Sequence, residues 1–183
     1  KAAAVDEGAE AVVKAVRLHH PASLDNLRLA DLPGRAPGPG EIRVRLRAGS
    51  LNFRDGLVVN GVFPVADGLV PLSDGAGEVL EVGAGVTAFA PGDRVVSVFH
   101  PNWADGHIDR AELDNSPGGP SEGFACEEAT RPATHFTRAP AHLSHAEAAT
   151  LTCAGVTAWR AVVTDGKVKP GDRVLVQGTG GVS

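Results

Sequence analysis

The chain has 183 residues, of which 43% are hydrophobic and 4% aromatic, and its formal net charge at pH 7 is −5. This hydrophobic content suffices for a core built mainly from valine, leucine and alanine, and the length fits one or two domains. The negative charge argues against nucleic-acid and anionic-membrane partners, and no apolar stretch approaches the roughly 20 residues of a membrane span.

The first part of the chain predicts a leader and three strands. Residues 1–11 are small and polar, and we expect a flexible leader there. Two apolar runs, 12–18 and 26–32, are separated by a turn-like segment and are expected to pair as a hairpin. Residues 41–48 alternate between apolar and charged side chains, which predicts a half-buried strand. Its two faces would carry Ile42, Val44 and Leu46 on one side and Arg43, Arg45 and Arg47 on the other.

The middle of the chain combines short elements with a long loop. Residues 53–60 suit a short helix, and residues 75–86 suit a strand, a turn and a second strand. A Pro-Gly-Asp turn precedes a further strand within residues 90–99. Residues 100–123 are rich in glycine and proline and show little periodicity, which is typical of a functional or mobile loop. Short strands are expected again within residues 124–138.

Two helices are predicted after these strands. The segment 143–151 has Ser144 as a candidate N-cap and Glu147 three residues later, which is the spacing of a capping box. Residues 155–166 form a second candidate helix that ends in glycine. Many short strands followed by two helices predict a partly open β-barrel that leads into a doubly wound domain.

The final segment carries a candidate phosphate-binding loop. Residues 173–176 form a short apolar run after a Pro-Gly-Asp turn, which is typical of a buried parallel strand. The glycines that follow would let the backbone approach a phosphate closely. The strict G-x-G-x-x-G pattern is not met, because Ser183 stands at the third glycine position. An ordinary glycine-rich turn is therefore the alternative.

Four segments together resemble the medium-chain dehydrogenase/reductase family, and in particular its zinc-independent, quinone-oxidoreductase-like and alcohol-dehydrogenase-like branch. They are AGSLNFRDGLVVNGVFP at 48–64, PLSDGAGEVLEVGAGVTAFAPGDRVV at 71–96, HLSHAEAATLTCAGVTAW at 142–159 and VKPGDRVLVQGTGGVS at 168–183. Their order and spacing are those of the family. The resemblance implies a mainly β fold, in which a GroES-like, partly open β-barrel with short helices leads into a truncated α/β Rossmann domain.

The resemblance also implies domain boundaries. Residues 1–11 would be the leader and residues 12–152 the GroES-like catalytic domain. Residues 153–183 would hold a linking helix and the first strand and glycine loop of a truncated Rossmann domain. The chain lacks methionine and stops at the candidate phosphate-binding loop, so we expect it to be part of a longer protein.

A catalytic zinc ion is not expected. The zinc-binding members of the family place Cys, His and Cys in three of the matched segments, where this chain has Asn52, Ser73 and Cys153. Amide and hydroxyl oxygens are poor replacements for thiolate and imidazole at a zinc centre. Residues 100–123 also lack the clustered cysteines of the family's structural zinc site. Cys153 is then expected to be a small buried apolar residue.

The resemblance implies two groups of site residues. Asn52 would lie at the pocket floor and donate a hydrogen bond to negative charge on the substrate, with Asp55 orienting its neighbours, so both are catalytic candidates. The structural alternatives are a helix cap for Asn52, a helix-start carboxylate for Asp55 and a turn residue for Asp74. Candidate cofactor contacts are Thr157, Gly178, Thr179, Gly180, Gly181, Val182 and Ser183.

With the family, these residues predict the N-terminal part of an NAD(P)-dependent oxidoreductase. Hydride transfer would reduce a quinone, an enone or an aldehyde, or oxidise an alcohol in reverse. The expected cofactor is NAD(P)H, with NADPH slightly favoured, and no zinc. The 183-residue chain alone is expected to be inactive. The alternative is a stand-alone GroES-like barrel that acts as a non-catalytic binding or interaction module.

Partners and location follow from composition and family. The expected partner is a small carbonyl, enone, quinone or alcohol substrate, with no nucleic acid and no membrane, and a homodimer is compatible with the family. Cys126 and Cys153 are the only cysteines and form no disulfide framework, which favours a reducing cytoplasm.

Overall fold

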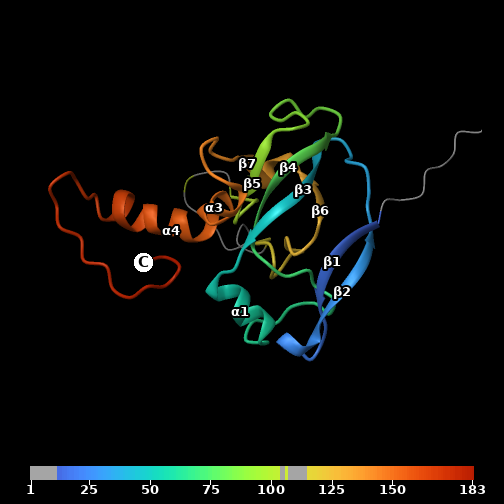
Figure 1. Cartoon of the computed structure of the whole chain (residues 1–183), viewed down its shortest axis with the longest axis horizontal. Coiled ribbons are helices and arrows are strands. Elements are labelled where there is room, and N and C mark those ends of the chain that lie inside the picture. The colour runs from blue at the N-terminus through green and yellow to red at the C-terminus, as the bar shows by residue number, and fades with distance from the viewer. Residues whose placement is uncertain (1–11, 104–105, 107–114) are drawn as a thin grey trace, which may run out of the picture.

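The computed structural model describes residues 12–103, 106 and 115–183. Within these residues the fold consists mainly of strands, in one two-stranded and one five-stranded sheet (Figure 1). The expected leader at 1–11 lies outside the described residues, as does part of the predicted loop 100–123. The described helices include none that is long and apolar enough to cross a membrane.

The smaller sheet is the predicted hairpin. β1 (Val12–Leu18) pairs antiparallel with β2 (Leu27–Pro33), and a 3-10 turn, η1 (Leu24–Asn26), joins them. Val13 and Ala15 of β1 share one buried face, and Leu18 at the end of the strand is fully buried from the other side. The hairpin prediction is confirmed.

The larger sheet is antiparallel throughout, with the strand order β6-β3-β4-β5-β7. Isolated bridges, such as the one between Ala15 and Cys126, connect the backbone of β1 to residues outside the hairpin, and no continuous ladder joins the two sheets among the described residues. The mainly β class is confirmed, and its barrel-like part consists of two open sheets. The strands are β3 (Glu41–Ser50), β4 (Asp74–Val82), β5 (Arg94–Ser97), β6 (Glu128–Pro132) and β7 (Phe136–Arg138), with the 3-10 turn η2 (Ala133–His135) before β7.

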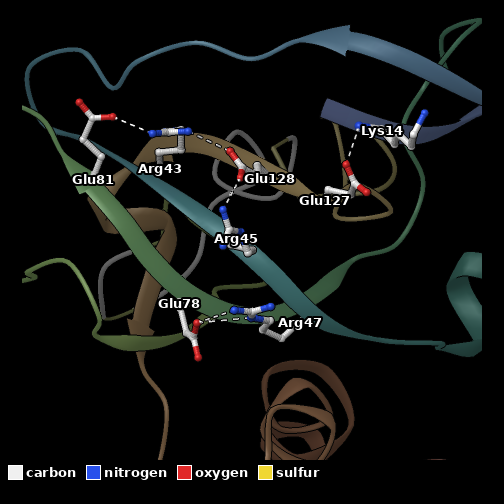
Figure 2. Close-up of polar contacts among 8 residues, drawn as sticks. All are labelled: Lys14, Arg43, Arg45, Arg47, Glu78, Glu81, Glu127 and Glu128. Carbon is white, nitrogen blue, oxygen red and sulfur yellow. Dashed lines mark hydrogen bonds and ion pairs between the residues drawn. The ribbon is translucent and has the colours of Figure 1, made fainter. Parts of the chain in front are cut away.

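The two faces of β3 differ as the alternation predicted. Ile42 and Val44 are fully buried, whereas the arginines between and after them lie on the outer face. There they pair with glutamates of the neighbouring strands β4 and β6 (Figure 2). The pairs, at 3.0–3.3 Å, are Arg43–Glu81, Arg43–Glu128, Arg45–Glu128 and Arg47–Glu78.

The core contains little aromatic surface, as the composition indicated. Its main cluster packs on the inner face of the larger sheet, where Phe124 and Phe136 meet edge to face at 6.0 Å between ring centroids. A second cluster joins small residues of β4 and β5 to Ala148 and Ala149. The main cluster is Ile42, Val44, Val79, Val95, Phe124, Ala129 and Phe136.

Two predicted helix starts are confirmed. α1 (Phe53–Val59) follows β3, and Asn52 is its N-cap residue. α3 (His145–Ala149) begins at the predicted capping box, where the Ser144 hydroxyl accepts a hydrogen bond from the Glu147 N–H at 3.2 Å.

The predicted helix at 155–166 belongs to a longer helical segment. A π-helical turn, η3 (Leu151–Gly155), precedes α4 (Val156–Trp159), and a second one, η4 (Arg160–Asp165), follows it. This segment extends away from both sheets (Figure 1).

Two strand predictions were wrong. Residues 75–86 contain one strand, β4, and then a turn in which Gly85 has a φ of +81°. The partner strand comes only at β5, after the following Pro-Gly-Asp turn. Residues 173–176 form no strand, because a strand requires a hydrogen-bonded neighbour and this exposed segment has none among the described residues.

Candidate active site

Polar side chains gather where α1 begins beside the start of β4. The carboxylate of Asp55, which is buried, accepts a hydrogen bond from the Asn52 backbone N–H at 2.7 Å. It also accepts bonds from the backbone N–H and the hydroxyl of Ser73, each at 3.1 Å. These bonds hold the first turn of α1 against the segment that enters β4.

The side-chain amide of Asn52 joins this cluster from the other side. Its nitrogen donates to the Ser73 hydroxyl at 3.2 Å and to the Asp74 carboxylate at 2.8 Å. The other Asp74 oxygen accepts a bond from the Thr152 hydroxyl at 3.2 Å. Because an amide group carries two N–H donors, both hydrogens of Asn52 are engaged within the protein.

Asp74 is fully buried, and its environment favours the protonated form. Burial raises the pKa of Asp74 to about 6, hydrogen bonds from Asn52 and Thr152 limit the rise, and the charge of Asp55 adds to it. A carboxyl group with this pKa exchanges its proton near neutral pH. The cluster therefore contains one group that can hold a proton.

Cys153 lies beside the same carboxylates. It is a free thiol and only partly buried, so the expectation of a buried apolar residue was wrong. Its place on the half-exposed helical turn η3 is the reason. Burial raises the pKa of the thiol, and the charges of Asp74 and Asp55 raise it further. The thiol is therefore protonated at neutral pH and poorly suited to binding a metal.

A zinc ion does not fit this donor set. Asn52 and Ser73 present amide and hydroxyl groups that are already bonded to carboxylates. Zinc sites in proteins are built from thiolate, imidazole and carboxylate ligands. In the described ranges no group of three or more His, Cys, Asp and Glu residues is arranged to hold a metal ion.

The predicted cofactor contacts lie apart from this cluster. The hydroxyl of Thr157, on α4, donates to the carbonyl oxygen of Cys153 at 2.6 Å. Residues 178–183 form an exposed loop beyond the helical segment, where the Ser183 hydroxyl donates to the Gln177 carbonyl at 3.0 Å. The structure therefore unites Asn52 and Asp55 but does not bring the loop to them (Figure 1).

Arg54 also belongs to this region, although the sequence analysis did not select it. Its guanidinium lies over the ring of Phe99, 4.9 Å from the centroid. It donates to the Pro117 carbonyl at 2.8 Å and to the Ser116 hydroxyl at 3.3 Å. The one available signal was a cation placed between Asn52 and Asp55 in a matched segment.

Two clefts flank α1. One, of about 410 Å³, lies beside Gly56 and Val59 and is almost entirely apolar. The other, of about 200 Å³, lies beside Arg54 and Val58 and combines polar and apolar walls. The two clefts have no lining residue in common.

Comparison with known proteins identifies the family of this chain. The sequence model of the alcohol dehydrogenase GroES-like domain matches residues 38–141. A zinc-type alcohol dehydrogenase-like protein of Schizosaccharomyces pombe is 44% identical over 149 residues, which cover 79% of this chain and 43% of the relative. The chain thus spans less than half the length of that relative.

Solved structures show the same fold. A structure described as an alcohol dehydrogenase of Sinorhizobium meliloti has a TM-score of 0.87 at 42% identity, covering 96% of this chain and 52% of that one. An NAD-dependent alcohol dehydrogenase has a TM-score of 0.73 at 37% identity, covering 87% of this chain and 49% of that one. With the GroES-like match over more than half its length, the chain belongs to the medium-chain dehydrogenase/reductase family of alcohol dehydrogenase-like oxidoreductases.

Proposed function

We propose that this chain forms the catalytic-domain part of a zinc-free, NAD(P)H-dependent oxidoreductase. Its substrate is a quinone, an enone or an aldehyde, or an alcohol in the reverse reaction. The observation that carries the proposal is the cluster around Asn52 and Ser73, whose amide and hydroxyl groups are hydrogen-bonded to the carboxylates of Asp74 and Asp55. By resemblance, these two residues stand at zinc-ligand positions of the family. No relative supports the alternative of a non-catalytic binding module.

The glycine loop is the proposed phosphate-binding part of the cofactor site. NAD(P)H, with NADPH slightly favoured, supplies the hydride when bound. Gly180 and Gly181 are exposed, and a side chain at either position would meet nothing within 4 Å, so a phosphate could approach this stretch of backbone closely. The description of one related structure as NAD-dependent supports a nicotinamide cofactor. Thr157 is the proposed contact on the helical segment.

The substrate side of the reaction requires stabilisation of negative charge. Hydride addition to the β carbon of an enone shifts the C=C π pair into a new double bond between the α carbon and the carbonyl carbon, and the C=O π pair moves onto the oxygen to give an enolate. A proton from water then completes the saturated ketone. A delocalised enolate needs less local stabilisation than a simple alkoxide, so a site without zinc favours conjugated acceptors.

Asn52 and Asp55 have distinct roles in this proposal. The bond from the Asn52 amide to Ser73 is the longer of its two, and exchanging it would let the amide donate to a substrate oxygen. Asp55 is a positioning residue, because it holds the backbone of Asn52 and both donors of Ser73. Asp74 keeps the second amide hydrogen engaged and so orients the amide.

The test is Asn52→Leu in a fusion of this chain to the C-terminal part of the Schizosaccharomyces pombe relative, assayed for NAD(P)H-dependent enone reduction. Loss of one such donor lowers kcat by about 100- to 1,000-fold. Cofactor affinity should stay nearly unchanged. Asn60→Leu is the matched control, because Asn60 ends the same helix, is exposed and bonds only the Gly56 carbonyl. A kcat within about twofold of the parent would show that Asn52 only caps the helix and does not take part in the reaction.

A further inference from the structure

The smaller cleft beside α1 has the chemistry of a site for a carbonyl group. Its volume is about 200 Å³. One wall is apolar and is formed by Val58, Phe63, Pro64 and Val65, while Arg54 and Ser116 supply the polar edge. A small molecule with one polar atom and a hydrocarbon body matches such a division.

Arg54 retains donors that the protein does not use. A guanidinium carries five N–H groups, and the Pro117 carbonyl and the Ser116 hydroxyl each take one. No carboxylate within the described part of the chain lies at ion-pair distance from Arg54. The Phe99 ring holds the guanidinium in place from one side. The result is a positioned, partly buried cation with unused donors at the edge of a cleft.

Arg54 also lies close to the cluster described above. Arg54 stands in the first turn of α1, directly before Asp55 and two residues after Asn52, and its charge counteracts part of the rise that burial causes in the pKa of Asp74. Both hydrogens of the Asn52 amide are engaged by Ser73 and Asp74. Of the two donors at the start of α1, Arg54 is therefore the one that can donate to a substrate oxygen without losing a hydrogen bond within the protein.

We propose that Arg54 binds the carbonyl oxygen of the substrate, with the hydrocarbon part lying against Phe63, Pro64 and Val65. This inference rests on the proposed oxidoreductase function and adds to it a second hydrogen-bond donor for the substrate oxygen, besides Asn52.

The experiment is a titration of the 183-residue protein with cyclohex-2-enone, followed by NMR. We expect a saturable shift of the Arg54 Nε–Hε signal and of the Ser116 and Gly119 backbone amides. Arg54→Gln should weaken binding by at least about tenfold, because a charge-assisted bond is lost. Arg54→Lys, which keeps the charge but not the planar fork, should give an intermediate affinity.

Arg138→Gln is the matched control. Arg138 also lies over an aromatic ring, that of Phe89 at 5.7 Å, and bonds the Ala88 carbonyl at 2.8 Å, but it does not line the cleft. This variant should bind the enone within about twofold of the parent protein.

Three results would overturn the proposal. One is a saturable shift confined to the larger cleft, around Leu51 and Leu72. Another is binding of acetate at Arg54 without binding of the enone, which would make the cleft a simple anion site. The last is no enone binding by the unaltered protein, which requires no variant to fold. Each of these is independent of whether the fusion protein reduces enones, so failure here and failure of the proposed function are distinguishable.

Discussion

At the scale of single residues, the candidate site is a pair of buried carboxylates held by neutral donors. Asn52 donates to both carboxylates, whereas Ser73 donates to Asp55 alone, and no cation forms an ion pair with either aspartate among the residues described. Two carboxylates in one buried site cannot both ionise cheaply. Burial, together with the charge of Asp55, raises the pKa of Asp74 to about 6.

This pKa predicts how Asp74 changes stability with pH. The folded protein binds the Asp74 proton more tightly than the unfolded chain, where the ordinary value is 3.8. The contribution of Asp74 to the free energy of unfolding is therefore complete below about pH 4 and is lost as pH rises through about 6. Two pKa units correspond to at most roughly 3 kcal/mol.

Urea denaturation of the parent and of Asp74→Asn across this range checks the prediction. The free energy of unfolding of the parent should fall relative to the variant as pH rises. Asp93→Asn is a contrasting control, because Arg138 and the Ala90 N–H lower the pKa of Asp93. Its stabilising effect is instead lost as pH falls. Parallel pH profiles for the parent and Asp74→Asn would contradict the pKa assignment.

The same residues predict that the protein binds no stoichiometric zinc. Asn52 and Ser73 are tied to carboxylates, and the Cys153 thiol resists ionisation because burial raises its pKa. Elemental analysis of protein purified without chelator should find well below one zinc ion per protein chain. About one zinc per chain would show that the cluster rearranges to bind metal.

At the scale of elements, the pairing of β3 with β4 requires a glycine where the two backbones come close together. Gly77 of β4 lies opposite Leu46 of β3, and a Cβ atom at Gly77 would come within 2.0 Å of the Arg45 carbonyl oxygen. The exposed ion pairs across β6, β3 and β4 (Figure 2) contribute little each. They favour the observed register, because a one-residue slip would turn the arginines towards the core.

Two glycine substitutions should therefore have opposite effects. Gly77→Ala should destabilise the protein on the order of 3 kcal/mol or more, since a backbone carbonyl must move. Gly56→Ala should stabilise it by about 1 kcal/mol, because a glycine inside a helix is unfavourable. A side chain at Gly56 meets nothing within 4 Å. Thermal or urea unfolding of both variants checks this, and equal changes would contradict the steric argument.

Local sequence patterns made most helices and strands predictable. The site was harder to predict, because its contacts join residues that are far apart in the sequence. The alternation of β3 and the capping box at Ser144 each depend on neighbouring residues, and both are confirmed. The bond between Thr152 and Asp74 joins positions 78 residues apart, and no short pattern indicates it. The full use of the Asn52 amide depends on side-chain orientation, which the sequence does not reveal. Residues 173–176 have strand-like composition, but composition does not supply a neighbouring strand.

At the scale of the whole molecule, the compact part and the segment after η4 differ in burial. Beyond position 140, the buried residues are Ala148 and Ala149, and both belong to α3. By contrast, Leu175 is 83% exposed and Val176 is 60% exposed. Burial of apolar surface provides most of the stability of a fold, so residues 166–183 should contribute almost nothing to the stability of the compact part.

Removing residues 166–183 should therefore leave the urea midpoint unchanged. Brief trypsin digestion should cut at Lys167 or Arg173 before Arg43 and Arg45 of β3, because the backbone of these two arginines is paired on both sides. A lower midpoint for the shortened protein would mean that this segment packs on the sheets in solution. If that loss grew with protein concentration, a second copy would be covering the apolar side chains, since only association makes stability depend on concentration.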